Sequence, residues 1–108
     1  MLNVKEKYFS IANKMKTALA KDIPIISFRI FGSCAREEET FDSDIDVFIE
    51  VETLSQQDKK HIRDITWQIG LDTETVISPL IFSRDEIENS PLRSSSIVQN
   101  IMREGIAI

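Results

Sequence analysis

The sequence has 108 residues, of which 42% are hydrophobic and 29% are charged, a composition typical of folded globular proteins and not of disordered ones. A chain of this length holds one small hydrophobic core, so we expect a single domain over residues 1–108. The net charge of −5 disfavours a long nucleic acid as a partner, whereas a small nucleotide accompanied by a divalent cation stays compatible with it.

The first predicted element is an amphipathic helix from about residue 3 to residue 20. Apolar residues recur there at steps of four and three: Val4, Tyr8, Ile11, Met15 and Leu19. A strand is predicted next over residues 25–31, because this stretch is short, β-branched and aromatic. It ends at Gly32.

A second strand is predicted over residues 45–51, where apolar residues alternate with a face that carries Asp46 and Glu50. A helix then follows from about residue 55 to residue 69, and Gly70 is expected to end it.

A third strand is predicted over residues 74–83, with Pro79 indicating an edge position or a bulge. Ser83 can cap a short helical turn. The last helix starts at one of the serines at 94–96 and ends at Gly105. The expected order is therefore helix, strand, strand, helix, strand, helix.

Gly32 and Ser33 follow the first strand and precede a plausible helical turn. A glycine lets the backbone approach a ligand closely, and the N–H groups at a helix start favour an anionic phosphate. Gly-Ser is also a common structural turn, so this pair alone does not decide between the two interpretations.

Asp44 and Asp46 are two residues apart on the second strand, so both carboxylates should point to one face. Two carboxylates held this close repel each other unless a cation joins them, and Mg²⁺ with oxygen ligands is the usual one. The alternative is a pair of solvated aspartates on an exposed sheet face.

Together the two halves form the pattern Gly-Ser, ten intervening residues and Asp-x-Asp, with Ala35-Arg36 after the serine and Ser43 before the first aspartate. This pattern resembles the minimal nucleotidyltransferases of the DNA polymerase β superfamily. The segment from Ser90 to Ile106 is also similar to stand-alone bacterial and archaeal members, so the resemblance covers nearly the whole chain.

The resemblance implies an α/β (α+β) fold with a small mixed sheet flanked by helices. It also implies transfer of a nucleoside monophosphate from a triphosphate, with ATP expected, to a hydroxyl. Gly32 and Ser33 would hold the phosphates, and Asp44 and Asp46 would be the catalytic pair that binds Mg²⁺. Arg36 would add a charge contact to the triphosphate, although an exposed helix arginine explains it equally well.

The family also expects a third carboxylate on the strand after the second long helix, and here the sequence departs from the pattern. The expected place falls at or near Ser78, which cannot act as a carboxylate ligand or base. Glu74 would share the face of Ser78 if the strand were regular. A solvated residue before the strand is the favoured interpretation of Glu74.

Family members of this size are often antitoxins that silence a helical HEPN ribonuclease toxin by adding AMP or by binding. The resemblance therefore predicts an enzyme that modifies a HEPN-type partner protein or a small acceptor. The alternative is a catalytically weak or inactive module that binds a nucleotide and a partner. A third hypothesis is a structural domain in which the two motifs coincide by chance.

The sequence contains no apolar run near the roughly 20 residues that cross a bilayer, and no apolar signal-peptide core. Its single cysteine, Cys34, cannot form an internal disulfide. We therefore expect a cytoplasmic protein without membrane contact. The sequence does not decide whether the chain forms a homo-oligomer.

Overall fold

A computed structural model of the chain describes residues 4–32 and 44–108. The elements follow in this order: α1 (Val4–Ala20), β1 (Ile25–Phe31), β2 (Ile45–Val51), α2 (Gln56–Thr73), β3 (Ile77–Ser83), α3 (Arg84–Glu88), the 3₁₀ helix η2 (Pro91–Ser94), α4 (Ser96–Glu104) and β4 (Ile106–Ala107). The order expected from the sequence is confirmed, and η2 and β4 are additions to it.

The strands form one mixed sheet in the order β3-β2-β1-β4. β1 is antiparallel to both β2 and β4, whereas β2 is parallel to β3 and the chain crosses over between them through α2. The mixed sheet flanked by helices is therefore confirmed. β3 is an edge strand, which is where Pro79 was expected because proline cannot complete a central ladder.

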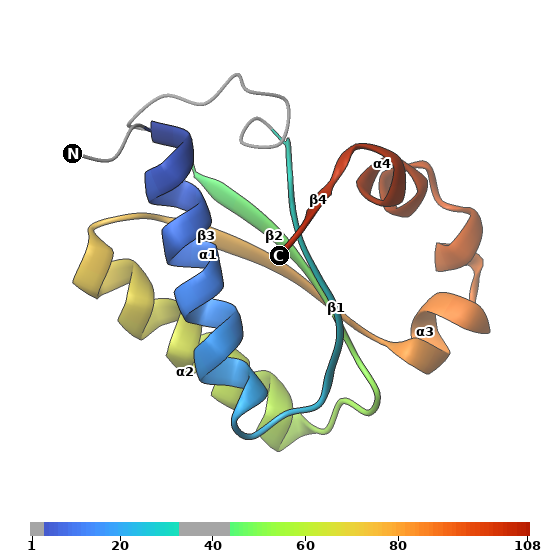
Figure 1. Ribbon diagram of the computed structural model, residues 1–108. Coiled ribbons are helices and arrows are strands. Elements are labelled where there is room, and N and C mark those ends of the chain that lie inside the picture. Colours follow the sequence, from blue (N-terminus) through green and yellow to red (C-terminus); the bar gives the residue numbers. More distant parts are fainter. Residues whose placement is uncertain (1–3, 33–43) are drawn as a thin grey trace.

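One face of the sheet is covered by α1 and α2 (Figure 1). The predicted stripe of α1 is buried at Tyr8, Ile11, Met15 and Leu19. It packs against β-branched and aromatic side chains of β1 and β2, and against two isoleucines of α2. These sheet and helix residues are Phe28, Ile30, Ile45, Val47, Ile49, Val51, Ile62 and Ile69. This apolar layer is the main core.

The opposite face of the sheet is turned toward α3 and α4 (Figure 1). Phe48 of β2 is fully buried there, and its ring centroid lies 5.9 Å from that of Phe82 on β3. α4 contributes Val98 and Ile101, which are also buried. Polar side chains of β2 interrupt this second, smaller core.

The end of α2 differs from the prediction. The helix does not stop at Gly70 but continues to Thr73, and Glu74 then ends it in the left-handed conformation, with φ of 52°. Gly70 is needed for packing, because a Cβ atom there would come within 2.9 Å of the Thr75 carbonyl oxygen. β3 consequently begins at Ile77 and not at residue 74.

Serine side chains cap the N-termini of three of the α-helices. Ser55 and Ser83 form capping boxes with Asp58 and Glu86, and Ser95 accepts a hydrogen bond from the N–H of Val98 at the start of α4. Within the described ranges, no helix is both long and apolar enough to span a bilayer.

Candidate functional site

Gly32 follows β1 and has a backbone conformation that an L-residue rarely adopts, with φ of +72°. A Cβ atom at this position would collide with the carboxylate oxygen Oδ2 of Asp46. Only glycine fits here for two separate reasons, its positive φ and the close approach of a carboxylate. The glycine and one aspartate of the sequence motif are therefore brought into direct contact.

Asp46 lies in the middle of a row of residues that crosses three strands. Its neighbour on β1 is Phe31, and its neighbour on the parallel strand β3 is Ser78. Neighbouring strands are roughly 5 Å apart and directly opposed residues point to the same side, so these three side chains share the face turned toward α4. Asp46 is half-buried and Ser78 is exposed.

Asp44 is exposed and comes immediately before β2, separated from Asp46 by the buried Ile45. The N–H of Ile45 donates to the carbonyl oxygen of Val76 at 2.9 Å, which fixes the start of β2 against the start of β3. The two aspartates thus flank one anchored residue at the strand end. Ser33 and Arg36 lie outside the described residues.

A groove of about 210 Å³ runs between the end of β1 and α4, next to Gly32. Phe31 forms one wall, and Ile97, Asn100 and Glu104 of α4 line the other. Sequence reasoning missed these α4 residues. Their spacing of three and four residues places them on one helix face, but no local pattern links that face to Gly32, about seventy residues away in the chain.

Glu74, considered from the sequence as a replacement for the third carboxylate, is not part of β3. It is the left-handed cap residue of α2, and Thr75 and Val76 separate it from the first residue of the strand. The strand alternation that would have placed Glu74 on the face of Ser78 therefore does not apply. The carboxylate that does line the groove beside Gly32 is Glu104.

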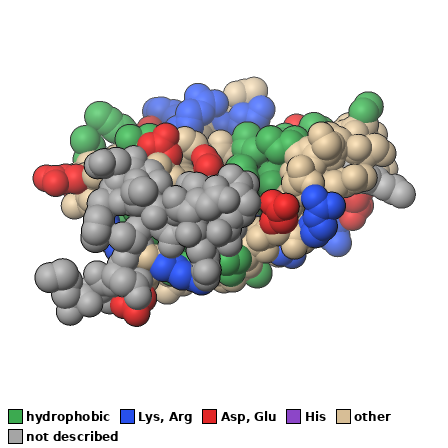
Figure 2. Space-filling view, turned by 90° about the horizontal axis from the view of Figure 1, so that it is seen from above, with side chains coloured by type: hydrophobic (Ala, Val, Ile, Leu, Met, Phe, Trp, Pro, Cys, Tyr) green, Lys and Arg blue, Asp and Glu red, His purple; other side chains and the backbone are tan. Residues whose placement is uncertain are grey.

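The face turned toward α4 carries opposite charges. Arg29 and Glu50 lie on the same side of the sheet as Asp46, and the Nε atom of Arg29 is buried without a hydrogen-bond partner among the described residues. Burial raises the pKa of the Glu50 carboxyl above its ordinary value, and the nearby Arg84 partly opposes this. Seen from the end where β1 finishes, acidic, basic and hydrophobic side chains are interspersed over the described surface (Figure 2).

The described carboxylates would share a cation with a bound ligand. Among the residues that the structure describes, no group of three Cys, His, Asp or Glu side chains is placed to bind a metal ion. Mg²⁺ characteristically needs only one or two carboxylates when phosphate oxygens of a nucleotide complete its shell. The close approach of Gly32 to Asp46 leaves backbone and carboxylate side by side, which suits such a ternary site.

Comparison with solved structures shows the same fold. A candidate nucleotidyltransferase from Sulfolobus solfataricus is 13% identical with a TM-score of 0.59, over 95% of this chain and 80% of that one. A toxin-antitoxin complex with AMP-PNP is 21% identical with a TM-score of 0.61, over 89% and 70% of the chains. A tri-AMPylated Shewanella oneidensis HEPN toxin in complex with an MNT antitoxin is 19% identical with a TM-score of 0.56, over 93% of this chain and 70% of that one.

No curated protein matches the sequence significantly. The family model of the nucleotidyltransferase domain, in contrast, matches residues 12–108. This match spans β1, the segment with the Gly-Ser motif, both aspartates, α4 and β4. The chain therefore belongs to the nucleotidyltransferase domain family.

Proposed function

We propose that this chain binds a nucleoside triphosphate, with ATP expected, together with Mg²⁺, and transfers the nucleoside monophosphate to a hydroxyl group of a HEPN-type partner protein. It would thereby act as the antitoxin of a toxin pair. The observation that carries the proposal is the contact between Gly32 and the Asp46 carboxylate, in a chain of the nucleotidyltransferase family.

In this proposal Asp44 and Asp46 supply the carboxylate ligands for Mg²⁺. Gly32, Ser33 and Arg36 hold the triphosphate, with the glycine backbone close to the phosphates because it carries no side chain. The bound metal would neutralise phosphate charge that develops during transfer. The protein itself mainly orients the triphosphate against the acceptor, which is the largest contribution available to such a site.

The groove beside Gly32 is the natural place for the nucleoside. Phe31, Ile97 and Ile101 give it apolar walls, and Asn100 adds an amide that can both donate to and accept from a base edge. Nucleotide sites commonly combine apolar walls with a few polar groups in this way. Because the groove lies next to Gly32, one nucleotide could place its nucleoside in the groove and its phosphates at Gly32.

The proposed acceptor rests on the solved structures of the same fold. One is a HEPN toxin that carries three AMP groups and is bound to an MNT antitoxin, and another is a toxin-antitoxin complex with AMP-PNP. These complexes support a HEPN-type partner for this chain. A partner would also supply the acceptor hydroxyl, which the small chain would then only need to position.

A second candidate function is favoured by Ser78. It stands directly opposite Asp46, where a third carboxylate of the family would be expected, and a serine hydroxyl is a poor base. The chain would then bind nucleotide and partner with little or no transfer. Because a general base is typically worth about 10²- to 10⁴-fold, we expect very weak turnover by the isolated chain in either case.

The test is to incubate the purified chain with labelled nucleoside triphosphates, Mg²⁺ and a HEPN-type protein, taken from a neighbouring gene where one encodes it. Label on the partner that requires Mg²⁺ and disappears in the Asp44→Asn, Asp46→Asn double variant supports the enzyme. Metal-dependent nucleotide binding without label transfer supports the binding module. If the double variant binds nucleotide and Mg²⁺ as tightly as the natural chain, the site assignment is wrong.

Two further variants locate the carboxylate that assists transfer. Glu104→Gln should lower transfer to the partner while nucleotide binding is kept, because Glu104 lines the groove beside Gly32. Glu74→Gln is the matched control, since Glu74 caps α2 outside β3 and should have no effect. Loss of transfer in the Glu74 variant alone would reverse this assignment.

A further inference from the structure

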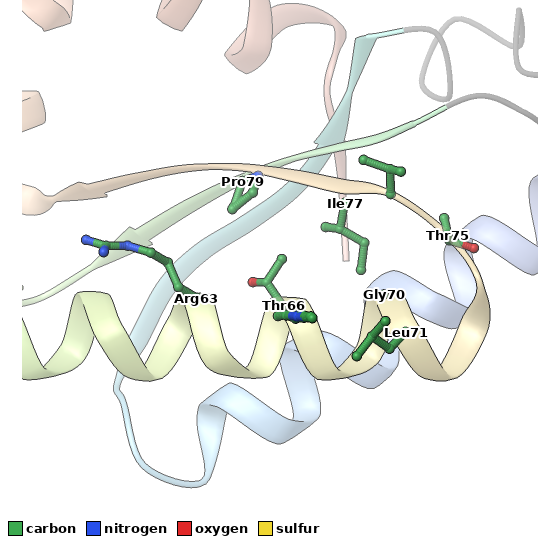
Figure 3. A pocket seen from close by; sticks show the side chains of 9 residues that line it. Arg63, Thr66, Gly70, Leu71, Thr75, Ile77 and Pro79 are labelled. Atoms are coloured by element: carbon green, nitrogen blue, oxygen red, sulfur yellow. The ribbon is translucent and has the colours of Figure 1, made fainter.

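A groove of about 370 Å³ lies between α2 and the edge strand β3, on the opposite side of the sheet from Asp46 (Figure 3). We call it the Trp67 groove, after the largest of its lining side chains. Trp67 is 50% exposed, and Leu71 and Val76, which line the same groove, are 60% and 61% exposed. Large apolar side chains gathered at a groove are a typical sign of a protein interaction site.

Strand addition does not explain this surface. β3 is the outer strand of the sheet, but Pro79 in its middle has no N–H group to offer to an added strand. Pro79 and Ile77 instead face α2 across the groove, as Figure 3 shows. A partner would therefore be bound through side chains that fill the groove and not through an extended sheet.

The order of charges along α2 indicates which partner fits. Lys60 comes seven residues before Trp67, and Glu74 comes seven residues after it. Seven residues are nearly two helical turns, so Lys60 lies on the same side of α2 as Trp67, and Glu74 follows directly after the last turn. Both side chains are exposed, and neither forms an ion pair with a residue that the structure describes.

We propose that the Trp67 groove binds a second copy of this chain, with the two α2 helices antiparallel and a twofold axis passing near Trp67. Such an interface is self-complementary. Lys60 of each copy would oppose Glu74 of the other, and the aliphatic stem of Arg63, four residues before Trp67, would cover Leu71, four residues after it. The two indole rings would fill the paired grooves and be removed from water.

This dimer would leave the candidate nucleotide site open. α2 packs on the core face of the sheet, whereas Asp46 and Ser78 share the opposite face with α4. The proposal therefore does not depend on nucleotide transfer, and either can fail without the other. Dimerisation is expected to leave Mg²⁺-dependent nucleotide affinity unchanged.

The experiment measures the mass of the full chain by sedimentation equilibrium over a wide range of concentrations. In parallel it follows the fluorescence of Trp67, which is the only tryptophan. We expect a dimer at high concentration and a shift of emission to shorter wavelength as it forms. Trp67→Glu should abolish the dimer measured by sedimentation, with circular dichroism confirming that this variant is folded.

Charge reversal tests the predicted pairing. Lys60→Glu and Glu74→Lys should each weaken the dimer by about tenfold, since two symmetric ion pairs are lost and like charges are opposed. The double variant, with both reversals in the same chain, should restore dimerisation. Lys14→Glu on the exposed side of α1 is the matched control and should change nothing.

A chain that is monomeric at every concentration overturns the proposal. So does a dimer that the single reversals do not weaken, or that the double reversal fails to restore. If the natural chain stays monomeric while Trp67→Glu abolishes binding of a HEPN-type partner, the groove belongs to that partner and a second copy is excluded.

Discussion

The two faces of the sheet are made by the same strands, yet their side chains have different chemistry. The face under α1 and α2 presents apolar residues of β1 and β2, which are buried except for the partly buried Ile25. The face turned toward α4 places Asp46, Glu50 and Ser78 beside Phe48 and Phe82. Burying polar groups costs stability, so the first face can be expected to hold the fold while the second keeps groups available for ligands. The following predictions test that division.

The largest effect is expected on the core face. Ile49→Ala removes a fully buried side chain and leaves a cavity, which typically costs about 2–5 kcal/mol. Urea unfolding should show this loss as a lower midpoint with an unchanged slope. Ser78→Ala, on the exposed part of the other face, should change stability by less than about 0.5 kcal/mol. Equal costs for the two variants would contradict the division.

Gly32→Ala is expected to affect both stability and ligand binding. An alanine held at positive φ costs about 1–2 kcal/mol, and its Cβ atom also meets the Asp46 carboxylate. Calorimetry should show a lower melting temperature and loss of Mg²⁺-dependent nucleotide binding. In an Asp46→Ala background the same substitution should cost less, because the collision is gone. An identical cost in both backgrounds would show that the two residues do not compete for space.

Ser78→Asp places a second carboxylate opposite Asp46. Without metal, the repulsion should lower the free energy of unfolding by up to about 1 kcal/mol. Saturating Mg²⁺ should recover this loss and tighten nucleotide binding, because the metal gains an oxygen ligand. Ser78→Asn has the same shape without the charge, so it should show neither effect. If Mg²⁺ changes neither the stability nor the nucleotide affinity of the Ser78→Asp variant, the metal site lies elsewhere.

Glu50→Gln should have the smallest effect. Burial raises the pKa of Glu50, so the folded state retains its proton at pH values where the unfolded state has lost it. Its contribution to stability therefore falls as the pH rises above the ordinary pKa of a glutamate, and the glutamine variant removes this loss. The melting temperature of the variant should exceed that of the natural chain near neutral pH, by less than the roughly 4–8 °C that 1 kcal/mol is worth in such a domain. The difference should vanish in acid.

Local patterns in the sequence predicted the core face well. The bounds of β1 and β2 match because their apolar and β-branched runs are short and end at polar residues or at Gly32. The end of α2 could not be predicted in the same way. A glycine usually marks the end of a helix. Gly70 instead lies inside α2, because the Thr75 backbone packs too closely against it for a side chain.

The candidate site was predictable only in part. Asp46 and Gly32 belong to one motif, and their contact follows from the antiparallel pairing of β1 with β2. Ser78 was predicted only as the approximate place of a third carboxylate, and its pairing with Asp46 comes from the structure. The contribution of Asn100 and Glu104 depends on how α4 packs against the end of β1, and such a long-range contact leaves no trace in local periodicity.

The position of β4 has a consequence for how the protein folds. Ile106 pairs with Ile30 near the end of β1, and the N–H of Ile108 donates to the Phe28 carbonyl oxygen at 2.9 Å. Closing so long a loop is entropically slow, so contacts of this kind tend to form late. During synthesis, β1 cannot pair with β4 until β4 has left the ribosome. The groove between Gly32 and α4 therefore also forms late. A nascent chain would then form its apolar core before it forms the groove proposed for the nucleoside.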